Sequence, residues 1–157
     1  MPYIIDGDNL IGSAPDISLD DPQARTRLIQ VVKRFQQNKK SNVIIVFDGV
    51  PENGVHNEDI CDKFCVRYPR TDTNADEEIK HILGGFSYFK DVVVVTSDKE
   101  LKCFAKKKGA KTINSTEFYF ELKRIFRHYG KKEETEKRID TQLSDIEVDQ
   151  WMKVFED

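Results

Sequence analysis

Short runs of apolar residues alternate along the chain with longer segments in which apolar residues recur every three or four positions. The runs have the length and the Val and Ile content of strands, whereas the longer segments have the period of amphipathic helices. The pattern predicts strands at 3–6, 43–48, about 61–68, 91–96 and about 111–113, and helices at about 20–38, 75–86, 98–108 and 116–128. Because strands and helices alternate, we expect an α/β fold with a mainly parallel sheet and helices on both faces.

The periodic pattern stops after Gly130, where Lys, Glu, Thr and Arg dominate and predict a linker or a solvated helix. Residues 144–147 then have the form of a capping box. An apolar face on a short helix follows, made by Val148, Trp151, Met152 and Phe155. We therefore predict one domain over residues 1–130, and over 131–157 an acidic linker with a short amphipathic helix. That helix docks on its own domain or on a protein partner.

The length and the charge fit one folded domain with an acidic tail. The chain has 157 residues and a formal net charge of -3, which hides an asymmetry. Residues 1–132 carry 22 Lys and Arg against 19 Asp and Glu, whereas residues 133–157 carry 3 against 9. Eleven of the basic residues fall between 98 and 132, and they include Lys106, Lys107 and Lys108. Such a concentration suits a polyanionic ligand, although charge runs are also common on solvated helix faces.

Membrane proteins and disulfide-rich secreted proteins do not fit the sequence. No stretch is long and apolar enough to span a bilayer, and the first predicted strand begins too early to leave room for a signal peptide. We therefore expect a cytoplasmic protein with no membrane contact. Its three cysteines, Cys61, Cys65 and Cys103, cannot all pair within one chain, and we expect reduced thiols. His56 lies near Cys61 and Cys65 in the sequence, but a zinc site would still lack its fourth ligand.

Four carboxylates stand where predicted elements meet. Asp6 and Asp48 end the first two apolar runs, Asp98 follows the run of four valines at 92–95, and Asp76 opens a predicted helix. The carboxyl ends of parallel strands share one edge of a sheet, so acids far apart in sequence converge there. Carboxylate oxygens are the ligands that hard cations such as Mg²⁺ and Mn²⁺ prefer. The layout therefore predicts a metal site.

Each acid also has a purely structural explanation. Residues 97–100 form a capping box, so Asp98 would favour the positive end of a helix dipole. Asp76 lies near a helix start that Thr73 or Asn74 can cap, while residues 6–9 and 48–49 read as turns. Capping alone, however, does not require that the central strands all deliver an acid to the same edge.

Four blocks, in this order, resemble a known family. They are Asp6-Gly7-Asp8-Asn9-Leu10, Ile45-Val46-Phe47-Asp48-Gly49, Thr73-Asn74-Ala75-Asp76 and Val94-Val95-Thr96-Ser97-Asp98. Together they look like the NYN-domain, YacP-like ribonucleases, a branch of the PIN-like nucleases. The resemblance covers roughly residues 3–127. It implies a PIN-like three-layer α/β/α fold and divalent-metal-dependent cleavage of RNA. We expect an endonuclease, although the residues leave exonuclease action open.

The resemblance also implies roles for individual residues. Carried over by position, the metal-binding acids are Asp6, Asp76 and Asp98, with Asp48 beside them as a fourth catalytic acid and Asn9 and Ser97 as polar supports. The sequence departs from the family pattern at Asp8, an extra acid, and at Lys99-Glu100, where relatives often bring another acid. The number of metal ions therefore stays open.

The chemistry of this constellation agrees with the resemblance. Mg²⁺ or Mn²⁺ held by the acids would orient a water, lower its pKa and neutralise charge on a scissile phosphate. Substrate contacts are predicted for Asn9, Ser97, Lys99, Lys102 and Arg70. The expected partner is RNA, free or on a ribosome.

Two other classes of protein remain open at the level of sequence. Asp6-Gly7-Asp8 after a strand also resembles the Asp-x-Asp motif of haloacid-dehalogenase-like phosphatases, with Thr96 or Ser97 as the later hydroxyl. That motif, however, has Thr or Val where this chain has Leu10. A non-catalytic RNA- or ribosome-binding module would keep the same fold without the reaction.

Overall fold

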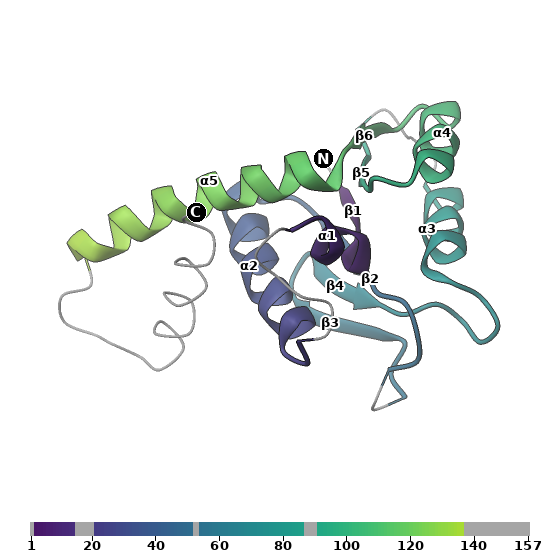
Figure 1. The fold of residues 1–157 in the computed structure, drawn as a ribbon, viewed down its shortest axis with the longest axis horizontal. Coiled ribbons are helices and arrows are strands. Elements are labelled where there is room, and N and C mark those ends of the chain that lie inside the picture. Colours follow the sequence, from purple (N-terminus) through teal and green to yellow (C-terminus); the bar gives the residue numbers. More distant parts are fainter. Residues whose placement is uncertain (1, 15–20, 52–53, 87–90, 137–157) are drawn as a thin grey trace.

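The computed structural model describes residues 2–14, 21–51, 54–86 and 91–136. Within these ranges it contains six strands and five helices, which Figure 1 labels. In chain order they are β1 (Tyr3–Asp6), α1 (Gly7–Ser13), α2 (Ala24–Lys39), β2 (Val43–Val46), β3 (Asn57–Cys61), β4 (Phe64–Arg67), α3 (Ala75–Gly84), β5 (Val93–Val95), α4 (Lys99–Lys107), β6 (Lys111–Ile113) and α5 (Ser115–Glu136).

The strands form one sheet in the order β3-β4-β2-β1-β5-β6. All neighbouring pairs are parallel except β3 and β4, which are antiparallel. In the central strand, Ile4 is paired with Ile44 of β2 on one side and with Val94 of β5 on the other. The predicted mainly parallel sheet is confirmed.

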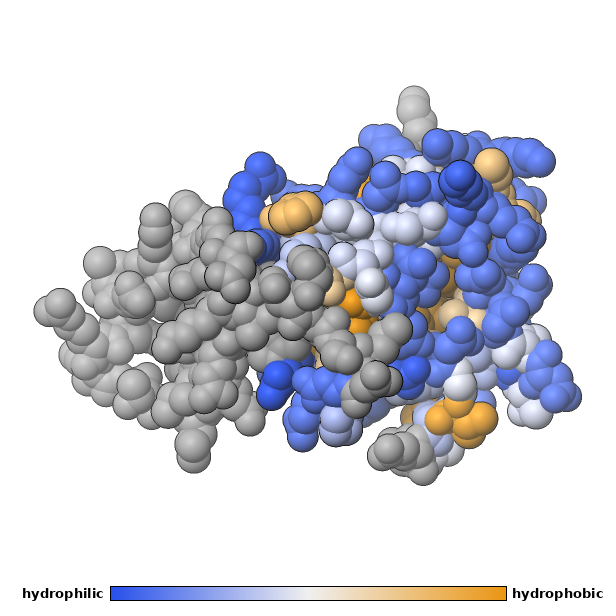
Figure 2. Space-filling view, in the orientation of Figure 1, coloured by the Kyte–Doolittle hydropathy of each residue, from blue (hydrophilic) through white to orange (hydrophobic). Residues whose placement is uncertain are grey.

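Helices cover both faces of the sheet (Figure 1). Because side chains alternate along a strand, Ile5 points into a core shared with α1, α2 and α5, whereas Ile4 points into a second core shared with α3 and α4. Both isoleucines are fully buried. The predicted three-layer α/β/α arrangement is therefore confirmed. The surface in Figure 2 is mostly hydrophilic over α3 and α4, as expected when the apolar residues fill the two cores.

Local predictions differ from the structure at three places. The expected strand at about 61–68 is present as β4, but it is shorter and is preceded by an unpredicted strand, β3, with a turn at Lys63, whose φ of 68° is in the left-handed region. The expected turn at residues 6–9 is instead the start of α1 at Gly7. The last helix runs past the predicted end at residue 128 to Glu136. Of the two alternatives predicted after Gly130, a linker or a solvated helix, the structure therefore has a helix as far as Glu136.

The predicted tail helix with Trp151 and Phe155 lies outside the described residues. No described helix is both long enough and apolar enough to cross a membrane.

Candidate active site

The strand order reverses at β1. From β1 the chain moves to β2 and β4 on one side, then crosses back through α3 to β5 and β6 on the other side. In open α/β sheets a crevice forms at the carboxyl ends of the strands where the order reverses, and ligands bind there. Asp6 is the last residue of β1, and Thr96 directly follows β5 at the same edge. The predicted acids meet around this point.

Asp6 lies at the strand-order reversal and is only 6% exposed. It occupies the N-cap position of α1 without making a capping hydrogen bond; instead its Oδ2 accepts a hydrogen bond from Thr96 Oγ1 at 3.2 Å. Burial, together with the charge of the nearby Asp76, raises the pKa of Asp6 to about 7. The hydrogen bond from Thr96 offsets part of that shift. Ionisation of Asp6 in the folded protein therefore costs free energy, and a bound cation would lower that cost.

Asp76 lies in the first turn of α3, whose N-cap is Asn74. The Asn74 side chain accepts a hydrogen bond from Glu77 N at 2.9 Å, so the cap predicted at Thr73 or Asn74 is Asn74. Burial raises the pKa of Asp76, and the charges of Asp98 and Asp48 raise it further. Asp76 therefore links the four acids electrostatically.

Asp98 is the N-cap of α4, as the capping-box pattern predicts. Its Oδ1 accepts a hydrogen bond from Leu101 N at 3.0 Å, and its own backbone N–H donates to Thr96 Oγ1 at 3.1 Å. Thr96 is fully buried and thereby connects Asp6 to Asp98. Within the described part of the chain, Asp98 Oδ1 is the carboxylate oxygen that caps the helix, and Oδ2 accepts no hydrogen bond there.

Asp48 joins the end of β2 to the start of α3. Its Oδ1 accepts a hydrogen bond from Ala75 N at 2.9 Å. Gly49 follows with a φ of 92°, so the predicted turn at residues 48–49 is present. The bond to Ala75 fixes the first turn of α3, and with it the position of Asp76.

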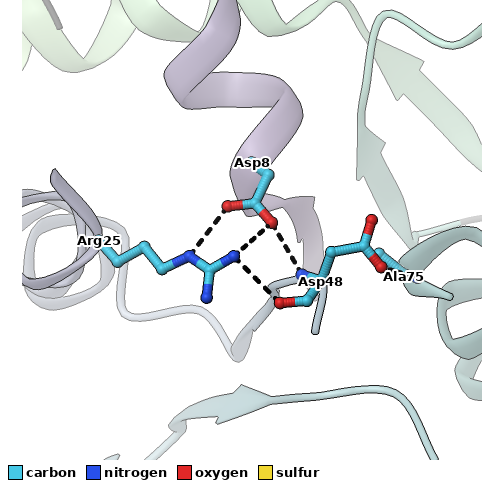
Figure 3. Close-up of polar contacts among 4 residues, drawn as sticks. All are labelled: Asp8, Arg25, Asp48 and Ala75. Atoms are coloured by element: carbon cyan, nitrogen blue, oxygen red, sulfur yellow. Dashed lines mark hydrogen bonds and ion pairs between the residues drawn. The ribbon is translucent and has the colours of Figure 1, made fainter. Parts of the chain in front are cut away.

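Asp8 and Arg25 form a clamp beside Asp48 that the sequence analysis did not foresee (Figure 3). Arg25 Nε and Nη2 donate to the two oxygens of Asp8 at 3.0 and 2.8 Å, and Asp48 N donates to Asp8 Oδ2 at 2.8 Å. Arg25 Nη2 also donates to the backbone oxygen of Asp48 at 3.0 Å. Both oxygens of Asp8 are therefore engaged, which disfavours Asp8 as the second acid of a phosphatase-like pair. Nothing in the spacing of Asp8 and Arg25 indicates this contact.

A second polar group anchors the loop after β5. Asn9 Oδ1 accepts hydrogen bonds from Ser97 N at 2.9 Å and from Ser115 Oγ at 2.6 Å. Ser115 N in turn donates to Ser97 Oγ at 3.2 Å. Ser115, the first residue of α5, is fully buried, and the sequence analysis missed it. The only feature of the sequence that points to Ser115 is its position directly before a predicted helix.

The predicted phosphate-binding residues lie on the elements around the crevice. Lys99 is exposed and Lys102 half-buried, both on α4 behind Asp98. Arg70 is exposed in the segment before α3 and contacts His81 of that helix. Lys80 was not predicted as a site residue. It forms ion pairs with Glu77 and Glu100. Its positive charge lowers the pKa of Asp76, whereas burial and the nearby acids raise it.

The donor chemistry fits a hard cation. Among the residues that the structure describes, no three Asp, Glu, His or Cys side chains lie close enough together to enclose a metal ion as they stand. Mg²⁺, however, keeps several waters and is commonly bound by one or two carboxylates together with substrate phosphates. Asp6 and Asp76, whose pKa values are both raised, supply such a pair of oxygen donors.

The fold and the site define a nuclease-type α/β domain with acids gathered at the carboxyl edge of its sheet. The chain belongs to the YacP-like NYN domain family, whose model matches residues 3–156. That match spans both the described domain and the acidic tail.

The fold is also similar to two crystal structures of Rae1 (YacP) from Bacillus subtilis. A mutant form superposes with a TM-score of 0.70 at 24% sequence identity, over 94% of this chain and 90% of that chain. The other structure gives the same TM-score and identity over 86% of this chain and 80% of that chain. No curated protein matches the chain significantly.

Proposed function

We propose that the protein is a divalent-metal-dependent ribonuclease that cleaves RNA phosphodiester bonds internally, in the cytoplasm. The observation that carries this proposal is the buried Asp6 at the strand-order reversal, with a pKa of about 7 that the neighbouring Asp76 helps to raise. Acids held together in this way repel one another until a cation joins them. In a YacP-like NYN domain, RNA is the substrate that this chemistry supports.

The proposed ligands of Mg²⁺ or Mn²⁺ are Asp6 and Asp76, the pair whose pKa values are raised, and Asp98, the third predicted ligand, would contact the ion through one of its waters. When bound, the ion supplies an activated water and neutralises charge on the scissile phosphate. Thr96 orients the Asp6 carboxylate through its hydroxyl and holds the backbone at Asp98. Asp48 acts on the reaction indirectly, because its bond to Ala75 sets the start of α3.

The proposed RNA contacts are electrostatic. Lys99 and Lys102 on α4 and Arg70 before α3 flank the acids in the fold and would bind phosphates on either side of the cleaved bond. Asn9 supports the site rather than the substrate, because both of its observed contacts hold the Ser97 loop and α5.

Cleavage of mixed RNAs, with and without Mn²⁺ or Mg²⁺, tests the proposal. RNA on ribosomes should be included beside free RNA. We expect metal-dependent internal cleavage that is lost in Asp6→Asn and in Asp76→Asn. Asp91→Asn is the matched control, because Asp91 is exposed at the opposite edge of the sheet, before β5. Full activity in either site variant would refute the assignment of the site.

A non-catalytic RNA-binding module is the second candidate. Two of the acids have roles in the fold that need no metal, because Asp98 caps α4 and Asp48 accepts a hydrogen bond from Ala75 N. These roles favour a module that binds RNA without cleaving it. RNA binding by the wild-type protein without cleavage under any metal condition would select this candidate.

A further inference from the structure

A pocket of about 310 Å³ lies beside the candidate active site. Its walls come from the start of α2 with Pro22 and Arg25, from the segment after β2 with Val50 and Pro51, and from Tyr68 after β4. Sites for small molecules begin at about 300 Å³. The pocket is therefore of a size for one nucleoside.

The pocket and the acidic site share a wall. Arg25 lines the pocket and also donates to the backbone oxygen of Asp48 at 3.0 Å, and Val50 follows Asp48 by two positions. A strand of RNA whose phosphate lies at the acids therefore has a neighbouring nucleotide beside the pocket. The pocket has no part in the metal chemistry proposed above, so its residues are free to act on selectivity.

The walls offer surfaces on which an unpaired base stacks. Val50 is 81% exposed, and Tyr68 presents an aromatic ring. The guanidinium carbon of Arg25 lies 5.0 Å from the centre of the Phe47 ring and 5.9 Å from that of Tyr68. Splayed-out bases stack on aromatic rings. Because Asp8 holds Arg25 through two hydrogen bonds, the direction of the remaining guanidinium N–H groups is fixed before a base arrives.

The polar groups of the pocket are complementary to one base. Arg25 Nε and Nη2 are engaged, whereas Nη1 has no acceptor within the described part of the chain and can donate. Glu58 of β3 is exposed and brings a carboxylate, which only accepts. Guanine alone among the four RNA bases presents two adjacent N–H donors, at N1 and N2, next to an acceptor, O6. The carboxylate matches the two donors and the guanidinium matches the acceptor.

We infer that this pocket binds an unpaired guanine of the RNA next to the cleaved phosphate, with Glu58 accepting from N1 and N2, Arg25 donating to O6, and Tyr68 contributing the stacking surface. The inference rests on the proposed function in assigning the pocket to an RNA substrate.

Titration of the full-length protein with nucleoside monophosphates in EDTA, followed by NMR, tests the pocket without metal or cleavage. We expect guanosine monophosphate to shift the Val50 and Tyr68 resonances and to bind about tenfold more tightly than the adenosine, cytidine and uridine monophosphates, the size expected for one good bidentate contact. Inosine monophosphate lacks the N2 amino group and should fall between them. Absence of shifts at Val50 and Tyr68, or equal affinities for all five nucleotides, would overturn the inference.

The Glu58→Gln variant tests how much the Glu58 carboxylate contributes to the preference for guanine. We expect its preference for guanosine monophosphate to fall to twofold or less, because an amide offers only one acceptor. Glu117→Gln, an exposed change on α5, should keep the tenfold preference. A preference that survives Glu58→Gln would refute the recognition scheme. Selection of guanine by a protein that never cleaves RNA would overturn only the ribonuclease proposal, and cleavage without selection would overturn only the pocket.

Discussion

Asp6 is a buried acid whose burial and neighbours oppose its ionisation. A carboxyl group in the unfolded chain loses its proton near pH 3.8, whereas Asp6 in the folded protein keeps it to about pH 7. Between these values the folded state binds one more proton than the unfolded state. Stability that is present below pH 3.8 is therefore lost as the pH rises through 7, and Asp76, whose pKa is also raised, acts in the same direction.

We predict that the free energy of unfolding of the metal-free protein falls between pH 4 and pH 7 by about 2 to 4 kcal/mol. Asp6→Asn should remove most of this fall and be more stable than wild type at pH 7.5. Urea unfolding in EDTA across this pH range measures it, with Asp91→Asn as control. Identical pH profiles for wild type and Asp6→Asn would contradict the prediction.

Gly7 is required for steric reasons at the point where β1 passes into α1. A Cβ added there would lie 2.5 Å from Phe47 Cε1 and 2.9 Å from Ile45 Cγ2. Phe47 is fully buried and cannot move aside. The glycine thus allows α1 to start directly above β2, which places Asp6 and Asp8 on either side of that contact.

We predict that Gly7→Ala destabilises the protein by about 1 to 3 kcal/mol through overpacking. In a Phe47→Leu background the added cost of Gly7→Ala should be smaller, which a double-mutant cycle by urea unfolding measures. Gly84→Ala is the matched control, since nothing lies within 4 Å of a Cβ at that position of α3. Equal costs of Gly7→Ala in both backgrounds would refute the steric explanation.

At the scale of elements, partly buried and exposed side-chain hydrogen bonds hold the loops of the site in position. Ser115, at the start of α5, donates hydrogen bonds to Asn9 of α1 and to Ser97 in the loop after β5. The Asp8–Arg25 clamp joins α1 and α2 to the segment that follows β2. These bonds therefore join the loops that carry Asp48 and Asp98 to α1, α2 and α5.

We predict that Ser115→Ala costs about 0.5 to 1.5 kcal/mol of stability, because the hydrogen bond from its hydroxyl to Asn9 Oδ1 is lost, while Asn9 Oδ1 keeps its bond from Ser97 N. Metal-dependent cleavage should also fall, since the Ser97 loop carries Asp98. Thr116→Ala, the exposed neighbour, should change neither quantity by much. Thermal unfolding and a cleavage assay on the same samples measure both effects, and an unchanged melting temperature for Ser115→Ala would contradict the role of this bond.

At the scale of the whole molecule, the basic residues gather on and after α4. Lys106, Lys107 and Lys108 are exposed at the end of that helix. If RNA runs along α4 away from the acids, these lysines neutralise phosphates, and their counterions are released on binding.

We predict that replacing all three lysines by Gln flattens the dependence of log K on log salt by about 0.7 for each phosphate that is no longer neutralised. Lys33, Lys39 and Lys40, on and after α2, provide the matched triple replacement. Fluorescence anisotropy with a labelled RNA in EDTA measures both slopes. An unchanged slope in the α4 variant would mean that these lysines are only solvated surface.

The sheet and the position of the acids followed from the sequence because apolar runs with an acid at the end have a clear pattern. The parts that were missed have no such pattern. Residues 57–60 are Asn-Glu-Asp-Ile, an edge strand with almost no apolar content, and α1 has only seven residues. The hydrogen bonds that hold the loops of the site were missed for another reason. Contacts such as that of Ser115 with Asn9 depend on tertiary packing, which local sequence does not encode.

The hydrogen bond between Ser115 and Asn9 joins residues 106 positions apart, and the bond between Thr96 and Asp6 joins residues 90 apart. The central strand is also the first of the described strands to be synthesised, and its second neighbour, β5, is synthesised only later. During translation, at roughly 5 to 20 residues per second, most of the domain must therefore emerge before the surroundings of Asp6 are complete. A nascent chain carries Asp6 for several seconds before Thr96 can bond to it, so an unfinished copy lacks the buried acid on which the proposed reaction depends.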